Sequence, residues 1–271
     1  MSKWIVVGAV CVACLAILAT GALPPQVPAS PPNPADARQF HPLPFDQHGS
    51  STGLDGATLL NRSLATLKDV RWLNVAIWQR LHDDDVGFES EARLQLGPEH
   101  CARLESEVRV GAARCRTLVV SDGHAAAEVQ RVGDDKQRVR GSYLPERTKT
   151  AARERWLRDK GCSGPAPLLA ELRAGVPNWH VDAGVRNGRS VMRLQGELDQ
   201  SRLPAAAKTN VGARWCTLYL DAETLWPARI EWRTSPAPVG LYLEMEFREA
   251  TLNQALSPEE CARAFTYHSS R

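Results

Sequence analysis

The chain has 271 residues, of which 43% are hydrophobic and 24% are charged, so it can form a core and disorder is not expected. Its 33 basic and 31 acidic residues give a formal net charge of +2, without a long block of either sign. A nucleic-acid-binding surface, which needs Lys and Arg gathered on one face, is therefore not expected.

The first segment of the chain predicts export. Residues 4–23 are almost wholly apolar behind Lys3, as in a secretory signal, and residues 20–22 are small enough for cleavage. An uncleaved membrane anchor is the alternative, since about twenty apolar residues can cross a bilayer. A lipidation site at Cys14 is a third option. We expect an exported protein of the periplasm or cell envelope, with residues 1–23 as its signal peptide or anchor.

A proline-rich linker follows. Residues 24–44 hold eight of the 18 prolines of the chain, and residues 49–53 are small and flexible. Such a composition favours extended conformations and has little to bury. We assign residues 24–52 to the linker and residues 53–271 to a single folded domain.

The domain is predicted to begin with a helix. Asp55 can accept hydrogen bonds from the first backbone N–H groups of this helix. Four apolar residues follow at helical spacing and predict one buried side, namely Ala57, Leu60, Leu64 and Leu67.

Five segments with alternating apolar and polar residues come next and predict strands. They cover residues 72–81, 86–96, 102–110, 115–121 and 125–132. The breaks between them include Gly97-Pro98, Gly111 and the hairpin signal Asp122-Gly123. The acidic break at residues 83–85 has the ligand type for a cation, but an acidic turn is the favoured interpretation. Alternation with a turn about every ten residues predicts an antiparallel sheet with one apolar face.

The middle of the chain predicts two helices and a hairpin. Residues 148–160 are charged and helical in composition, and residues 168–172 indicate a second, short helix. The segments 179–185 and 189–198 then alternate on either side of Asn187-Gly188, a dipeptide typical of type I′ turns.

The C-terminal stretch from Arg214 to Tyr267 predicts three strands and a closing helix over residues 258–265. Ser257 can cap that helix, and the two glutamates that follow Pro258 lie where the helix dipole favours negative charge.

No catalytic or metal-binding motif is found, and the seven histidines are scattered over the chain. We therefore expect no enzyme, no cofactor and no metal site. Five cysteines lie outside the export segment, and their spacing suits neither zinc nor a dense disulfide framework. Their pairing is left open, with one bridge, between the two nearest cysteines, as an option. They are Cys101, Cys115, Cys162, Cys216 and Cys261.

The strand order and turns of the domain resemble those of the LolA-like family of periplasmic lipoprotein carriers. The N-terminal part of the resemblance comprises residues 75–79, 91–98 and 118–123, which give a strand ending in Gln, a strand leading to a Pro turn and a strand ending in Asp-Gly. The C-terminal part comprises residues 218–231, 245–247 and 256–258, together with Phe265. The resemblance spans residues 55–267.

This resemblance implies a mainly antiparallel β fold with some α structure, a half-open β-barrel of about eleven strands lidded by a few helices. It also implies an apolar concave face that binds an apolar ligand, such as lipid or the acyl chains of a lipoprotein. A packed core and a ligand surface have the same sequence pattern, so both stay open for these strands. The side chains expected on the concave face are Val75, Ile77, Phe88, Leu94, Leu104, Met192, Leu194, Trp226, Ile230, Trp232, Leu243, Met245 and Phe247.

A second hypothesis uses the same fold differently. If residues 4–23 stay in the membrane, the domain is a tethered structural or sensor domain that binds a protein partner, itself membrane-bound in one version. In neither hypothesis is nucleic acid a partner.

Overall fold

The structure is a computed structural model that describes residues 46–47, 55–81, 88–133, 139–199, 201–202, 213–236 and 241–267. The predicted export segment, most of the linker and the acidic break at residues 83–85 lie outside these ranges. The boundary predicted at residue 53 also lies outside them.

The strands form one twelve-stranded, wholly antiparallel sheet. The prediction of about eleven strands is confirmed, with the two-residue β1 in addition. The strands are β1 (Asp46–Gln47), β2 (Leu73–Leu81), β3 (Phe88–Leu96), β4 (Cys101–Val110), β5 (Ala113–Asp122), β6 (Ala126–Val132), β7 (Val139–Leu144), β8 (His180–Arg186), β9 (Arg189–Glu197), β10 (Trp215–Asp221), β11 (Pro227–Arg233) and β12 (Leu241–Leu252).

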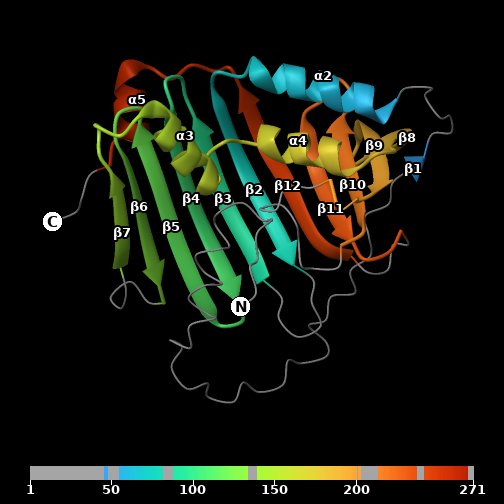
Figure 1. The fold of residues 1–271 in the computed structure, drawn as a ribbon, viewed down its shortest axis with the longest axis horizontal. Coiled ribbons are helices and arrows are strands. Elements are labelled where there is room, and N and C mark those ends of the chain that lie inside the picture. The colour runs from blue at the N-terminus through green and yellow to red at the C-terminus, as the bar shows by residue number, and fades with distance from the viewer. Residues whose placement is uncertain are drawn as a thin grey trace.

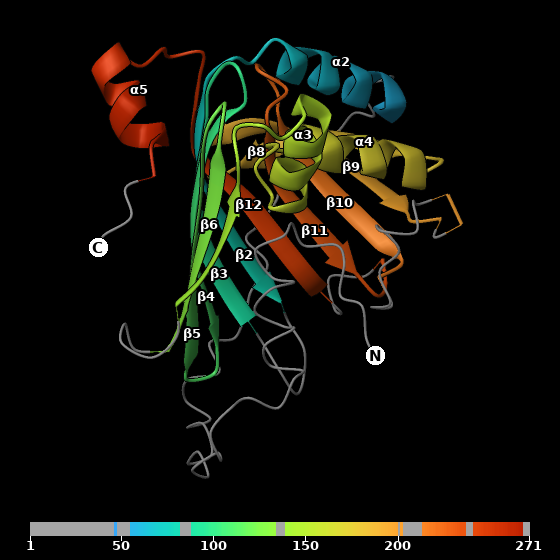
Figure 2. The same cartoon turned by 60° about the vertical axis from the view of Figure 1, so that its left-hand side comes forward.

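Across the sheet the order is β1-β8-β9-β10-β11-β12-β2-β3-β4-β5-β6-β7. The pairing of β12 with β2 joins the C-terminal strands to the N-terminal meander, and β1 and β7 are the two edges. The edges do not pair with each other, and the sheet bends so that β5 and β6 stand across from β10 and β11 (Figures 1 and 2). The fold is therefore the half-open barrel that the resemblance implies.

Four helices accompany the sheet in the part of the chain that the structure describes. They are α2 (Gly56–Lys68), α3 (Thr150–Asp159), α4 (Ala166–Gly175) and α5 (Pro258–Phe265). The first three lie on the inner side of the bend, along one end of the strands, whereas α5 lies on the opposite side (Figures 1 and 2). We call these two sides of the sheet the inner face and the outer face. No helix in the described part of the chain is long and apolar enough to span a bilayer.

The predicted helix caps are confirmed. The Asp55 carboxylate accepts hydrogen bonds from the backbone N–H groups of Ala57 and Thr58, at 3.3 and 3.1 Å. At α5, Ser257 and Glu260 form a reciprocal capping box. These contacts hold the first turns of α2 and α5 at the predicted residues.

One detail of the predicted helix face is wrong. Ala57 is exposed, and the buried side of α2 instead runs through Gly56, Leu59, Leu60, Ser63 and Leu67. The close approach of Gly56 to Trp179, the residue before β8, sets this orientation, because an added Cβ would lie only 2.3 Å from the Cβ of Trp179.

The tight turns also follow their sequence signals. Asn187 and Gly188 have φ values of 51° and 74°, the left-handed pair that a type I′ hairpin requires between β8 and β9. At the turn from β5 to β6, Asp122 Oδ1 accepts hydrogen bonds from the backbone N–H groups of His124 and Ala125, both at 2.8 Å. Two strands, β1 and β7, have no counterpart among the predicted segments.

The core lies between the inner face and α2–α4. At Gly196 in β9, an added Cβ would lie 2.3 Å from Val176 Cγ1 and 2.6 Å from the carbonyl oxygen of Asn178. The chain that follows α4 thus approaches the sheet as closely as glycine allows, and this contact fixes the distance between α4 and β9.

The first prediction concerns this contact. Gly196→Ala is expected to lower the free energy of unfolding by about 1–3 kcal/mol, because a backbone carbonyl must move to admit the methyl group. Urea denaturation measures the change. Gly141→Ala in β7 is the control, since its Cβ meets only the carbonyl oxygen of Glu128 at an ordinary 3.6 Å. Equal stabilities of the two variants would contradict the close packing at Gly196.

Candidate functional site

The inner face collects all the residues predicted for the concave side. Strand register places them on the same face, and twelve of the thirteen are buried; Ile77 is half-buried. They belong to or pack against one apolar cluster that also includes side chains of α2, α3 and α4. The structure therefore brings the predicted residues together, while their contact with a ligand stays a prediction.

The apolar part of the inner face runs straight across the C-terminal strands. Leu194 of β9 pairs with Leu218 of β10, which pairs with Ile230 of β11 and then with Met245 of β12. Three of these four side chains have no exposed surface, and Met245 is 4% exposed. Trp226, just before β11, packs edge-on against Phe247 with ring centroids 6.2 Å apart. An apolar surface thus continues over four strands.

The character of the inner face changes at β2. Met245 pairs with Gln79 of β2, and Gln79 pairs with Ser90 of β3. In the neighbouring row, Ser106 of β4 pairs with Thr117 of β5, and Thr117 pairs with Gln130 of β6. The five polar side chains in these two rows are all buried. The inner face is therefore amphipathic, apolar over β8–β12 and increasingly polar from β2 to β6.

Some of these buried polar groups are paired within the protein. Glu128 accepts hydrogen bonds from Gln130 Nε2 at 2.9 Å and from Ser142 Oγ at 3.1 Å. It also forms an ion pair with Lys160 Nζ, which follows α3, at 2.6 Å. The polar end of the inner face is thus tied to the chain that leaves α3.

Other buried polar atoms have no hydrogen-bond partner within the described part of the chain. Gln79 Oε1, Ser106 Oγ and Thr117 Oγ1 are buried and lack a hydrogen-bond partner there, as do Arg153 Nε and Trp226 Nε1. We call Gln79, Ser106 and Thr117 the polar patch. The sequence prediction missed these residues, although one signal for them exists: Ser90 and Ser106 occupy inward positions of otherwise apolar alternations.

Arg153 fastens α3 to the end of the sheet. Its side chain is 7% exposed and donates hydrogen bonds to the carbonyl oxygens of Gly123, in the turn from β5 to β6, and of Thr148. A weaker bond, at 3.5 Å, reaches the carbonyl oxygen of Glu146. One charged side chain thus bridges the helix, its N-terminal approach and the sheet.

The outer face of the C-terminal strands holds buried charges, which the sequence analysis had not predicted. Arg229 bonds to Glu231, at 2.7 Å, and to Glu244 and Glu246. Arg233 and Arg186 approach Glu231 at 2.7 and 3.6 Å. Most of these side chains are at most 9% exposed. We call the following residues the charged cluster: Arg186, Arg229, Glu231, Arg233, Glu244 and Glu246.

The pKa values within the charged cluster follow this pairing. Burial raises the pKa of the Glu231 carboxyl, but Arg229 and Arg233 outweigh burial and hold that pKa below its usual value. The pKa of the Glu246 carboxyl is also below its usual value, because Arg229 and Arg248 outweigh the effect of burial. For Arg229, burial lowers the pKa of the guanidinium, and the three glutamates more than reverse this effect. Arg229, Glu231 and Glu246 are therefore ionised at neutral pH.

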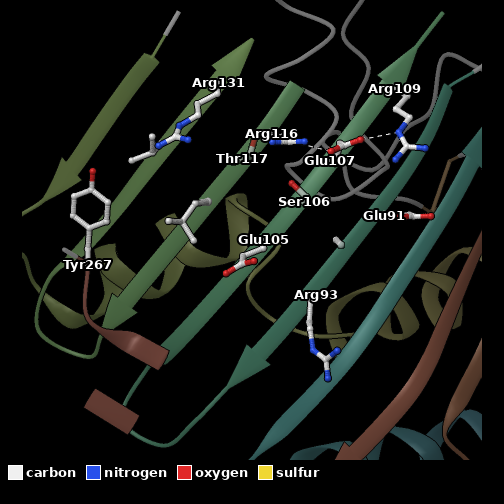
Figure 3. Close-up of a pocket in the computed structure, with 13 residues that line it drawn as sticks. Glu91, Arg93, Glu105, Ser106, Glu107, Arg109, Arg116, Thr117, Arg131 and Tyr267 are labelled. Atoms are coloured by element: carbon white, nitrogen blue, oxygen red, sulfur yellow. Dashed lines mark hydrogen bonds and ion pairs between the residues drawn. The ribbon is translucent and has the colours of Figure 1, made fainter. Parts of the chain in front are cut away.

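A hollow of about 610 Å³ lies elsewhere on the outer face, over β3–β6 and beside Tyr267 (Figure 3). Glu107 stands between Arg109 and Arg116 in it, with Nε–Oε distances of 2.7 and 2.9 Å, and these hydrogen bonds lower the pKa of the Glu107 carboxyl. Ser106 and Thr117 also line this wide-open hollow, whereas none of the thirteen residues predicted to bind a ligand does.

The structure shows no group of His, Cys, Asp and Glu suited to a metal ion among its described residues. The five cysteines outside the export segment are free thiols, so the optional bridge between Cys101 and Cys115 is not present. Burial, with Asp122 nearby, raises the pKa of Cys101 to about 11, and burial raises that of Cys162 to about 12. These thiols are therefore protonated and poor nucleophiles at neutral pH.

No family model matches the sequence, and no curated protein matches it. Solved structures do match. LprF from Mycobacterium bovis is 12% identical, over 74% of this chain and 94% of that chain, with a TM-score of 0.47. The Mycobacterium tuberculosis lipoprotein LppX is 13% identical, over 74% and 96%, with a TM-score of 0.42. A LolA superfamily protein from Nitrosomonas europaea is 9% identical, over 79% and 98%, with a TM-score of 0.28.

The matches thus include the family that the sequence resembles. At such identities and TM-scores the likeness concerns the fold alone. The function proposed below rests on the residues of this chain.

Proposed function

We propose that this chain is an exported, carrier-like protein that binds an apolar ligand, such as lipid or the acyl chains of a lipoprotein, on the inner face of its curved sheet. The observation that carries the proposal is the unbroken apolar surface over β9–β12 in a sheet whose edges do not close. A closed barrel of this kind would admit a ligand only through its ends. An open sheet admits one wherever a covering segment moves away.

The helices supply such a covering. Separate short helices, α2, α3 and α4, lie along one end of the inner face (Figure 1). The predicted binding residues are buried in this structure, which under this proposal corresponds to the closed state of the face. Entry of a ligand requires the helices to shift, and the ligand then replaces their apolar contacts.

The energy available for binding is sufficient. Each methylene removed from water contributes about 0.8 kcal/mol, so an acyl chain of about ten methylenes contributes about 8 kcal/mol. This gain offsets the displacement of a short helix that contributes few buried apolar side chains. Among the residues of α3, only Arg153 and Leu157 are buried, so α3 buries fewer apolar side chains than α2 or α4.

The test uses the purified full chain and N-phenyl-1-naphthylamine, a probe that fluoresces in apolar surroundings. Ile77→Gln is expected to weaken probe binding about tenfold or more, because an amide that must lose its water replaces an apolar contact on the inner face. Ala76→Gln, on the outer face of the same strand, is the matched control and should bind as the wild type does.

Two results would contradict the proposal. One is a wild-type chain that binds no probe and yields no acyl chain on lipid extraction. The other is equal weakening by both substitutions, which would place the probe outside the inner face. The second hypothesis, a tethered domain that binds a protein partner, stays a prediction. Membrane fractionation bears on it, because a cleaved and soluble product argues against a tether.

A further inference from the structure

The polar patch presents three buried polar atoms in one region of the inner face. Gln79 and Ser106 are 7% exposed and Thr117 is 6% exposed. Within the described residues, Gln79 Oε1 and the hydroxyl oxygens of Ser106 and Thr117 have no hydrogen-bond partner. Proteins rarely leave buried polar atoms unpaired, so each such group calls for an explanation, and three in one region, on β2, β4 and β5, call for a shared one.

Strand register shows how these residues lie. Ser106 is directly opposite Thr117 across β4 and β5. In the same row, Ala92 of β3 separates Ser106 from Ile77 of β2, and Gln79 is the next inward residue after Ile77. Neighbouring strands are about 4.8 Å apart and successive inward residues about 6.8 Å apart along a strand, so the backbones of Gln79 and Thr117 are about 16 Å apart. The long side chain of Gln79 shortens that gap. Small Ala92 leaves space between them.

Other buried polar groups of the inner face are paired within the protein. On β6, the next strand, Glu128 is bonded to Gln130, Ser142 and Lys160, so the protein's own side chains surround it. The polar patch lies beside this network and takes no part in it. The groups of the patch therefore remain available to a molecule that enters the inner face.

The patch adjoins the proposed apolar site. Gln79 pairs directly with Met245, which begins the apolar row that runs through Ile230 and Leu218 to Leu194. Four strand spacings separate β2 from β9, about 19 Å, which is close to the length of an extended long-chain acyl group. The inner face thus offers an apolar track that ends in hydrogen-bonding groups.

We infer that the ligand of the inner face is an amphiphile whose polar end carries hydroxyl groups, and that Gln79, Ser106 and Thr117 hold this end while the chain lies over β9–β12. The inference rests on the proposed function and adds the chemistry of the ligand's polar end. The patch carries no charge, and Gln79 Oε1 is an acceptor, so it requires a donor from the ligand. A neutral, hydroxyl-bearing end meets this requirement and an anionic end does not.

The experiment compares two probes that share one acyl chain and one ester group. 1-Monooleoylglycerol carries two free hydroxyl groups, and methyl oleate carries none. Each displaces N-phenyl-1-naphthylamine from the full chain, and the ratio of their two affinities isolates the contribution of the hydroxyl groups. In the double variant Ser106→Ala/Thr117→Val, the affinity for 1-monooleoylglycerol should fall about tenfold or more, from two lost hydrogen bonds, while that for methyl oleate stays unchanged.

Thr217→Val is the control. Thr217 is also a buried strand threonine, at 3% exposure, but it lies on the outer face opposite Glu231. The double variant is expected to fold at least as stably as the wild type, because it removes two unpaired buried hydroxyls. Thermal unfolding checks this.

The outcomes separate the two proposals. If the wild type binds both probes and the double variant keeps the wild-type affinity ratio, the hydroxyl-bearing end is overturned and the apolar site stands. If the double variant loses affinity for both probes equally, the hydroxyl-bearing end is also overturned, because a contact to that end can affect only 1-monooleoylglycerol. If the wild type binds neither probe, the proposed function itself fails.

Discussion

Replacing Arg229 by Met is expected to lower the free energy of unfolding at neutral pH by about 3–5 kcal/mol, because three carboxylates lose the cation that they share. Arg229 is 5% exposed, Glu231 is 3% exposed and Glu244 has no exposed surface. Water cannot replace the guanidinium at such depth. Methionine fills a similar volume, so the loss reports the uncompensated charge more than a cavity. Urea denaturation at pH 7 measures it.

The same substitution should weaken the dependence of stability on acidic pH. In the wild type the pKa values of Glu231 and Glu246 are held below their usual range, so their contribution is present at neutral pH and is lost as the pH falls through those lowered values. Without Arg229 these pKa values rise, because burial is then opposed only by Arg233 and Arg186 at Glu231 and by Arg248 at Glu246. The variant therefore has less of this stability to lose as the pH falls, and the difference in stability from the wild type narrows on acidification.

Arg248→Met is the matched control. Arg248 also bonds to Glu246, but its side chain is 51% exposed, and an exposed pair contributes less than about 1 kcal/mol. A loss at Arg229 no larger than that at Arg248, or a difference that does not narrow on acidification, would show that the charged cluster is solvated.

The second large effect is expected at Arg153. Arg153→Met should lower the free energy of unfolding by about 2–4 kcal/mol, because charge-assisted hydrogen bonds to the carbonyl oxygens of Gly123 and Thr148 are lost. The loss should be local at first. Hydrogen exchange of α3 should accelerate more than that of the central strands, since Arg153 is one of only two buried residues in that helix.

Arg155→Met tests whether the loss of stability comes from the hydrogen bonds of Arg153 and not from a change in the helix propensity of α3. Arg155 lies on the exposed side of α3, where substitutions usually change stability by less than about 0.5 kcal/mol. If both variants accelerate exchange of α3 equally, the loss reflects helix propensity, and Arg153 is not the fastening that the structure indicates.

The sequence predicted the elements well because their signals are local. Alternation defined the meander from β2 to β6, and Asn187-Gly188 specified the hairpin of β8 and β9. The weak strand β7 was missed, since Gly141 and Ser142 interrupt its alternation. The pairing of β12 with β2 joins residues far apart in the chain, and alternation holds no information about such partners.

The apolar part of the candidate site was predicted because it too depends on the local alternation of residues. Alternation separates two faces, so it placed the apolar residues together correctly. It does not reveal how deeply the other face is buried. The ion pair of Glu244 with Arg229 was therefore not predicted, because it depends on the register of β11 with β12. Likewise, Ser106 and Thr117 become neighbours only when β4 pairs with β5.

The alternation of the strands has a genetic consequence. On β4 the even-numbered residues, including Leu104 and Ser106, face inward, while Glu105 and Glu107 face outward. Adjacent codons therefore serve surfaces that do not touch. Mutations at one set of codons can alter what the inside of the sheet accepts while the outside stays the same, so the two surfaces of this protein are free to diverge at different rates.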